Sequence, residues 1–248
     1  MNYKDVRDKF VVLSGRYDLT TATAEDNGAD FFLNEGQKLL DRKFSGGKGL
    51  ARYPVVVVEG AMSATTTGLR VVKEVWVSNT DGRTELVRES FNTIRNAYQR
   101  SADQLVAGTP SYYAPGIFRP YPDTLATAGI AGMYDVSDLL LDGTHYTYDG
   151  ILFSPPANGT YTMQIVGLFD SPTLSATLSG VTWTQTKSFW TEVHPATLIK
   201  AGLFALESFY RSSQGMKDRM DSLMVDLTEL DHDLVEQTVA GESLQMGG

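Results

Sequence analysis

Apolar residues at a heptad spacing near the end of the chain constrain its fold more than any other feature. Methionine and leucine recur at alternating steps of four and three residues, with acidic side chains between them. A helix with this pattern has one narrow apolar edge and an otherwise polar surface, so it needs a surface to cover that edge. This apolar seam consists of Met216, Met220, Leu223, Leu227, Leu230 and Leu234.

The seam predicts a helix over about 213–240, roughly 40 Å long at about 1.5 Å per residue. Burying each seam residue is worth roughly 1.5–3 kcal/mol, so the seam is expected to be covered. Two partners remain open from the sequence. The seam packs either on the preceding helix of its own chain or in a groove of another protein.

Charge and composition narrow the function classes. The 248 residues have a net charge of -9 and include no cysteine, which excludes disulfides and thiolate chemistry. From residue 213 onward there are two basic residues against eight acidic ones. An acidic chain is poorly suited to gripping nucleic acid, because phosphate affinity comes from Lys and Arg. We expect no membrane span and no signal peptide.

Two segments on either side of the middle region have helical periodicity. Residues 29–44 follow Asp26-Asn27-Gly28, a helix-start sequence, and residues 196–210 follow Pro195, which suits a first helical turn. Small residues in the second segment permit close approach of another helix. The residues predicted to pack a helical core are Phe32, Leu39, Leu40, Leu198, Ala201, Gly202, Ala205 and Phe209.

The middle of the chain has a period of two, typical of strands. Residues 53–59, 69–78, 84–87, 111–118, 151–153 and 160–168 are predicted strands of an antiparallel sheet, with Tyr161, Met163 and Ile165 facing inward. Residues 89–100 are predicted to be helical. The segment 120–149 has no clear pattern and is expected to be a long insertion.

The sequence contains little evidence of a catalytic or metal-binding motif. His145, His194 and His232 are far apart in the sequence, and none belongs to an HxH or HExxH arrangement. A GxSxG element is also missing from the sequence. We therefore expect no enzyme activity, no metal and no cofactor.

Three sequence blocks resemble the head-to-tail adaptor proteins of tailed bacteriophages. The block 7–19 ends in Ser14-Gly15-Arg16-Tyr17-Asp18-Leu19, the block 27–42 begins with Asn27-Gly28-Ala29-Asp30-Phe31-Phe32, and the block 190–207 begins with Trp190-Thr191-Glu192-Val193-His194-Pro195. Residues 70–77, 109–114 and 151–168 are similar to the β insertion that some of these adaptors carry. His194 departs from the residue that many relatives have before the proline.

The resemblance implies an α+β fold with three parts. These are a helical bundle core from residues 1–50 and 190–212, an antiparallel β-rich insertion at 51–189, and a long C-terminal helical extension at 213–248 that docks on a partner. It also implies a structural protein of the virion, assembled in the host cytoplasm. About twelve copies would form a ring beneath the portal and extend the DNA channel towards the tail.

The partners implied are the portal protein, neighbouring copies of the chain, a downstream tail protein and passing double-stranded DNA without sequence-specific binding. The seam residues Met216, Met220, Leu223, Leu227, Leu230 and Leu234 are then the expected portal-binding residues. An alternative starts from the aromatic residues of the middle region, among them Trp76, Tyr112 and Tyr161. In that hypothesis a β-domain of a phage tail binds a glycan or partner, and the helices form an oligomerisation stalk.

Overall fold

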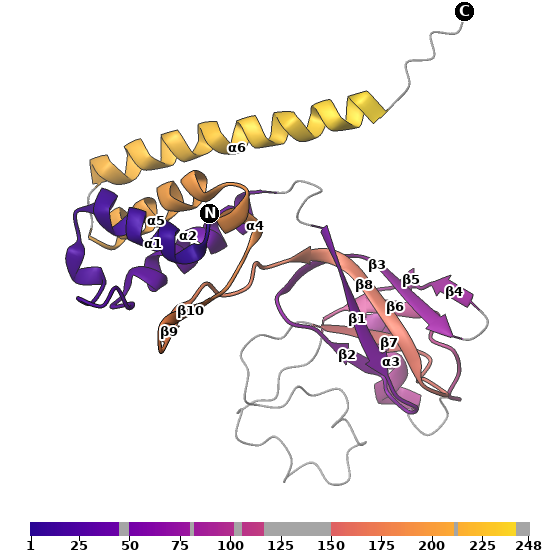
Figure 1. Cartoon of the computed structure of the whole chain (residues 1–248). Helices are drawn as coiled ribbons and strands as arrows, with labels where there is room; N and C mark the ends of the chain where they lie inside the picture. Colours follow the sequence, from indigo (N-terminus) through magenta and orange to yellow (C-terminus); the bar gives the residue numbers. More distant parts are fainter. Residues whose placement is uncertain (45–49, 80–81, 102–105, 117–149, 211–212, 242–248) are drawn as a thin grey trace, which may run out of the picture. The chain divides into compact units, whose positions relative to one another are not determined.

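The computed structural model describes residues 1–44, 50–79, 82–101, 106–116, 150–210 and 213–241, without the side chains of 79, 98–101 and 231–241. The fold is α+β, as predicted. It consists of two compact units, one formed by Met1–Gly49 with Asp170–Gly248 and the other by Leu50–Phe169 (Figure 1). The helical unit is therefore discontinuous in the chain, and the β unit is inserted between its two halves.

Polar side chains accept backbone N–H groups at the start of the first two helices of the helical unit. Helix α1 (Tyr3–Ser14) starts where the Asn2 side chain accepts the N–H of Asp5, and it ends at Gly15 with a φ of 68°. A short 3₁₀ turn, η1 (Tyr17–Leu19), follows. Helix α2 (Ala29–Lys43) begins after Asp26, whose carboxylate accepts the N–H groups of Gly28 and Asp30. The N-cap residue of α2 is Gly28, and the predicted start sequence supplies the Asp26 carboxylate just before it.

The core of this unit forms where α2 packs against α5 (Pro195–Phe209), which follows the single-turn α4 (Phe189–Glu192). Pro195 occupies the first turn of α5, as predicted. A Cβ atom on Gly36 would lie 2.6 Å from the backbone nitrogen of Gly202, so the two helix backbones are in close approach. Phe10, Leu33, Leu40 and Leu198 fill the space around this contact.

A β-hairpin that the sequence did not predict completes the helical unit. It consists of β9 (Ala176–Ser179) and β10 (Thr182–Gln185). The expected β-rich insertion at 51–189 was therefore too long, because residues from 170 onward belong to the helical unit. The reason is contact: Leu174 and Ala176 are buried in the helical core, and Lys4 lies over the Trp183 ring at 5.3 Å.

Helix α6 (Ser213–Gly241) is a single helix close to the predicted bounds. It packs on α5 and continues past the end of that helix (Figure 1). The extension expected to stand apart at 213–248 is therefore part of the helical unit over the residues that the structure describes.

The β unit contains two sheets, each of four strands within the described residues. The first has the order β1-β8-β3-β4 and is antiparallel; the second has the order β2-β7-β6-β5. In the second sheet β5 pairs with β6 in parallel, so the prediction of a purely antiparallel arrangement was wrong for this pair. The strands are β1 (Leu50–Val57), β2 (Ser63–Thr65), β3 (Leu69–Asn79), β4 (Gly82–Glu85), β5 (Val87–Arg88), β6 (Tyr112–Pro115), β7 (Gly150–Ser154) and β8 (Tyr161–Phe169).

The core of the β unit follows the predicted alternation. Tyr161, Met163 and Ile165 of β8 are all buried, and Val75 and Val77 of β3 pack with them. Helix α3 (Phe91–Ser101) packs on β6 and β7 through Ile94. The predicted insertion at 120–149 lies outside the described residues. Among the helices that the structure does describe, none is both long enough and apolar enough to span a bilayer.

Candidate interaction surfaces

The heptad seam of α6 is largely covered by its own helical unit. Leu223, Leu227 and Leu230 are only 0%, 4% and 8% exposed, and all three belong to the core that contains Leu198 and Leu203 of α5. Met220 is partly buried against the same core. Of the two partners that the sequence left open, the seam packs on the first, the preceding helix of the same chain.

A polar contact beside the seam fixes the same pairing of helices. The ammonium group of Lys200 in α5 lies 2.7 Å from a carboxylate oxygen of Asp226 in α6. The Thr197 hydroxyl donates to the other oxygen of Asp226 at 3.4 Å. Because Asp226 lies between Leu223 and Leu227 in sequence, these bonds and the leucine contacts set one register between α5 and α6.

The expected portal-binding role is therefore corrected for Leu223, Leu227 and Leu230. A buried side chain cannot contact a second protein unless the helix detaches, and detachment would expose three leucines at roughly 1.5–3 kcal/mol each. Met216 is only half-buried. The side chain of Leu234 lies outside the described residues, so its predicted role stays a prediction.

Most of the residues predicted to form the helical core do so. Phe32, Leu40, Leu198, Ala201 and Gly202 are buried. Leu39 and Ala205 are partly buried against the same core. The exception is Phe209, which is 63% exposed, so its assignment to the core was wrong. Phe209 is the last residue of α5, and its ring contacts Phe31 and Phe32 of α2 at its edge while most of the side chain stays exposed.

Phe209 instead belongs to an exposed aromatic surface of the helical unit, which we define as Phe31, Phe209 and Tyr210. The three side chains are 54%, 63% and 50% exposed. The Phe209 ring makes edge contacts with Phe31 at 6.4 Å and with Tyr210 at 5.5 Å between ring centroids. Large, partly rigid aromatic side chains of this kind are enriched at protein interfaces.

An arginine holds one edge of the aromatic surface in place. The Arg16 guanidinium lies 4.5 Å from the centre of the Tyr210 ring and donates to the Tyr210 hydroxyl at 2.8 Å. Arg16 also forms two hydrogen bonds with Asp18, which lower the pKa of that carboxyl group. The loop that follows α1 is thus tied to the end of α5.

A second candidate surface is an apolar groove of about 460 Å³ on the helical unit. Side chains of α1, α5 and α6 line it. Three of these lining residues are basic and none is acidic. The full lining is Met1, Lys9, Leu13, Pro195, Ala196, Ile199, Lys200, Leu203 and Arg219.

A charged network inside the helical unit has a structural role. The buried Arg7 side chain lies 3.1 Å from Asp30 and donates to the carbonyl groups of Ala24 and Ala176. The Tyr3 hydroxyl donates to the same Asp30 oxygen at 2.6 Å. Burial raises the pKa of Asp30, an effect larger than the opposing effects of Tyr3 and Arg7. These bonds join α1, α2 and β9.

The described residues form no candidate metal site, and the side chain of only one of the three histidines is described. In the part of the chain that the structure describes, no cluster of three or more His, Cys, Asp or Glu side chains could hold a metal ion. His194 packs against the rings of Phe189 and Trp190. His145 and the side chain of His232 lie outside the described residues.

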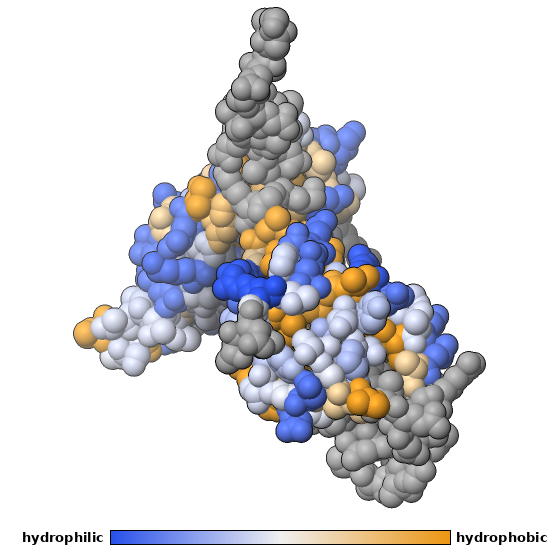
Figure 2. Space-filling view, turned by 90° about the vertical axis from the view of Figure 1, so that its right-hand side faces the viewer, coloured by the Kyte–Doolittle hydropathy of each residue, from blue (hydrophilic) through white to orange (hydrophobic). Residues whose placement is uncertain are grey.

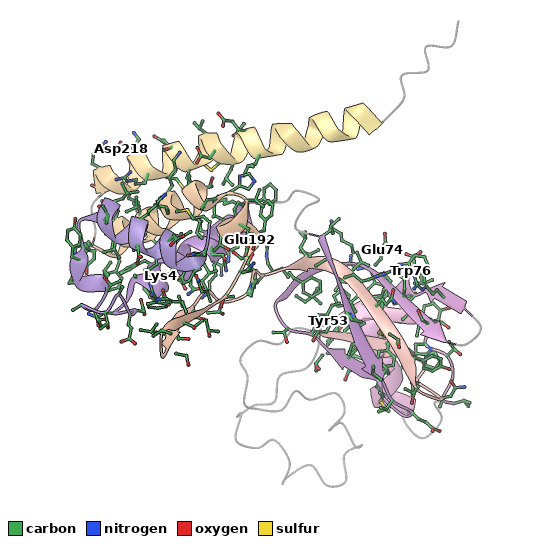
Figure 3. All side chains as sticks on the ribbon, viewed as in Figure 1. Lys4, Tyr53, Glu74, Trp76, Glu192 and Asp218 are labelled. Atoms are coloured by element: carbon green, nitrogen blue, oxygen red, sulfur yellow. The ribbon has the colours of Figure 1, made fainter. Side chains whose placement is uncertain are left out.

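Aromatic residues of the β unit make contacts within their own unit. The Trp76 indole donates to Glu74 at 3.1 Å, and the two labelled side chains lie next to each other (Figure 3). Tyr53 stacks on Phe169 with ring centroids 5.8 Å apart. On the face of the molecule in Figure 2, hydrophobic residues form small separate groups among hydrophilic ones.

Comparisons with known proteins add no assignment to these surfaces. No protein-family model matches the chain, and no curated protein matches it.

Proposed function

We propose that this chain is a head-to-tail adaptor of a tailed bacteriophage. About twelve copies would form a ring beneath the portal, link the capsid to a downstream tail protein and extend the DNA channel. The protein is then a structural component of the virion without enzymatic activity. It is assembled in the host cytoplasm.

One observation carries the proposal. The three sequence blocks that resemble adaptors, 7–19, 27–42 and 190–207, lie far apart in the chain but contribute to one hydrophobic core. Phe10 and Leu19 come from the first block, Leu33 and Leu40 from the second, and Leu198 from the third. The blocks thus belong to one helical unit, and the β unit enters the chain between the second and third blocks.

The charge of the chain is compatible with a channel for DNA. A net charge of -9 repels phosphate, so DNA would pass through such a ring without being held. Several acidic residues of α6 are exposed, including Asp218, which is labelled in Figure 3, and Asp221. Exposed acidic residues are common on proteins, so this point is secondary to the shared core.

The portal contact needs a surface other than the buried leucines of the seam. In this proposal the aromatic surface of Phe31, Phe209 and Tyr210 takes that role, because it is exposed and already ordered. Its rings contact one another and Arg16 holds Tyr210, so little side-chain freedom is lost on binding.

A binding experiment with the portal protein of the same virus tests the proposal. Wild-type chain should bind the portal, and the double substitution Phe31→Ser with Phe209→Ser should weaken binding by roughly 1,000-fold if each ring contributes roughly 2 kcal/mol. Val181→Ser is the matched control, because Val181 is 97% exposed at the tip of the β9–β10 hairpin. It should leave the affinity unchanged.

Two outcomes would contradict the proposal. Failure of the wild-type chain to bind the portal would remove the adaptor function. Specific binding of a glycan by the chain without the portal would instead support the glycan-binding alternative. Equal affinities of the double variant and the wild type would leave the adaptor function standing but remove the aromatic surface as its portal contact.

A further inference from the structure

The apolar groove with three basic lining residues, called the basic groove below, lies between α1 and α6 and has no role in the proposed function. Its floor is α5, and its apolar lining includes Leu13, which is 62% exposed, together with Ile199 and Leu203. A volume of about 460 Å³ lies within the range of roughly 300–1,000 Å³ that proteins use for ligands. A groove flanked by two helices is a common seat for a third amphipathic helix.

The charges at the groove favour an acidic occupant. Lys9 and Arg219 are exposed, and neither forms an ion pair with a described side chain. Lys200, the third basic lining residue, is neutralised by Asp226. Two cations beside an apolar surface would therefore be complemented by a helix that carries both leucines or valines and carboxylates.

The end of α6 has this composition. Residues 231–241 continue the helix past the last buried leucine, Leu230. Their sequence includes Leu234, Val235 and Val239 as apolar residues and no Lys or Arg. Its acidic residues are Asp231, Asp233 and Glu236.

This end of α6 cannot fill the groove of its own copy. Arg219 at the groove and Leu234 belong to one continuous helix, and fifteen residues at about 1.5 Å each separate them by roughly 22 Å along its axis. A straight helix cannot return to its own earlier turns. The occupant must come from a second molecule.

We propose that residues 231–241 of one copy dock in the α1–α5–α6 groove of the next copy. The contact is heterologous, because groove and occupant are different parts of the chain. Repeated contacts of this type close into a ring when the rotation between copies allows it. The inference rests on the proposed ring for its biological meaning. It specifies which surfaces join neighbouring copies.

Site-directed cross-linking tests the contact, and the natural chain contains no cysteine to interfere. Full-length Leu13→Cys, in the groove, is mixed with full-length Leu234→Cys, in the end of α6, under mild oxidation. We expect a covalent heterodimer with at least a tenfold higher yield than from a mixture of Val181→Cys with Leu234→Cys. Val181 is exposed and lies outside the groove.

Charge reversal separates a specific contact from random collision. Adding Lys9→Glu and Arg219→Glu to the Leu13→Cys chain should reduce the heterodimer at least tenfold, and Asp231→Lys with Asp233→Lys in its partner should restore it. Arg42→Glu with Lys43→Glu is the matched control, because it makes the same charge change at exposed positions of α2 outside the groove. That control should leave the yield unchanged.

The outcomes distinguish the two proposals. Equal cross-linking of Leu13→Cys and Val181→Cys, or no effect of the groove reversal, would overturn the docking contact. The portal-binding experiment is independent of this result. A chain that cross-links as expected but does not bind the portal would retain the contact between copies and lose the adaptor function.

Discussion

Gly36 of α2 faces Gly202 of α5 at a distance that leaves no room for a side chain. A Cβ atom at Gly36 would lie 2.6 Å from the Gly202 backbone nitrogen and 2.7 Å from the carbonyl carbon of Ala201. Because both obstacles are backbone atoms, neither can turn away. The close approach brings the α2 face that includes Leu33 and Leu40 onto α5.

Gly36→Ala should therefore destabilise the helical unit by roughly 1–3 kcal/mol through separation of the two helices. Urea unfolding followed by circular dichroism measures the change. Gly159→Ala is the control, since a Cβ atom there meets nothing within 4 Å and its backbone is not left-handed. A Gly36→Ala midpoint equal to that of the wild type would contradict the close packing.

The packing of α6 on its own unit predicts an asymmetry between neighbouring positions. Leu223→Ala should cost roughly 2–5 kcal/mol, because Leu223 is fully buried. Met224→Ala, one residue away and 42% exposed, should change stability by no more than about 0.5 kcal/mol. Similar small effects at both positions in denaturant unfolding would mean that α6 does not pack on α5 in solution.

A buried hydrogen-bond cluster joins two distant parts of the helical unit. Asp41 accepts hydrogen bonds from the Trp190 indole at 2.8 Å and from the backbone N–H and hydroxyl of Ser171. Asp41→Ala leaves the buried indole N–H without this acceptor, which should cost at least roughly 1–3 kcal/mol. In a double-mutant cycle with Trp190→Phe, the two losses should be less than additive. Strict additivity would show that the bond contributes nothing.

Alkaline pH should weaken the fold through Tyr3. Burial, with the hydrogen bond to Asp30 as the second cause, raises the pKa of the Tyr3 hydroxyl above its ordinary value of 10.0. Above that pH the unfolded chain loses the Tyr3 proton while the folded chain keeps it. The free energy of unfolding therefore falls with rising pH, by up to about 1.4 kcal/mol per unit from this group.

Comparison with Tyr3→Phe isolates this effect from the other tyrosines. Urea unfolding of both proteins between about pH 8 and 11 should show a steeper loss of stability in the wild type. The variant is less stable at pH 8, because it lacks the hydrogen bond to Asp30, so the two curves should converge as pH rises. Parallel curves would contradict a protonated, buried Tyr3.

Local patterns predicted the elements of this fold better than their partners. The helical spacing of 196–210 and the alternation of Tyr161, Met163 and Ile165 report burial directly, and both were confirmed. The seam correctly predicted the helix α6. Its spacing alone cannot show whether the surface that covers it belongs to the same chain or to another protein. That information lies in Lys200, Thr197 and Asp226, which meet only after folding.

Phe209 and the β9–β10 hairpin were predicted wrongly or missed, each for its own reason. Phe209 continues the apolar spacing of α5, so periodicity placed it in the core, but at the end of α5 its ring contacts Phe31 and Phe32 at the edge and stays 63% exposed. The β9–β10 hairpin was missed because its short strands, such as Thr182-Trp183-Thr184-Gln185, have weak alternation. Lys4 and Arg7 over Trp183 attach it to the helical unit through contacts distant in sequence.

The basic groove also left little signal in the sequence. Lys9 and Arg219 are 210 positions apart, and each reads as an ordinary exposed cation in its own helix. Only the packing of α1 and α6 on either side of α5 brings them to one groove. Charge complementarity with residues 231–241 then becomes a hypothesis that can be tested.

The most direct test of the adaptor account is the mass and symmetry of the assembly formed with the portal protein of the same virus. The purified chain would be mixed with assembled portal, weighed by native mass spectrometry and imaged by electron microscopy. The account predicts a ring of about twelve copies attached to one end of the portal. Portal particles that remain bare, with the chain left as free monomers, would contradict it.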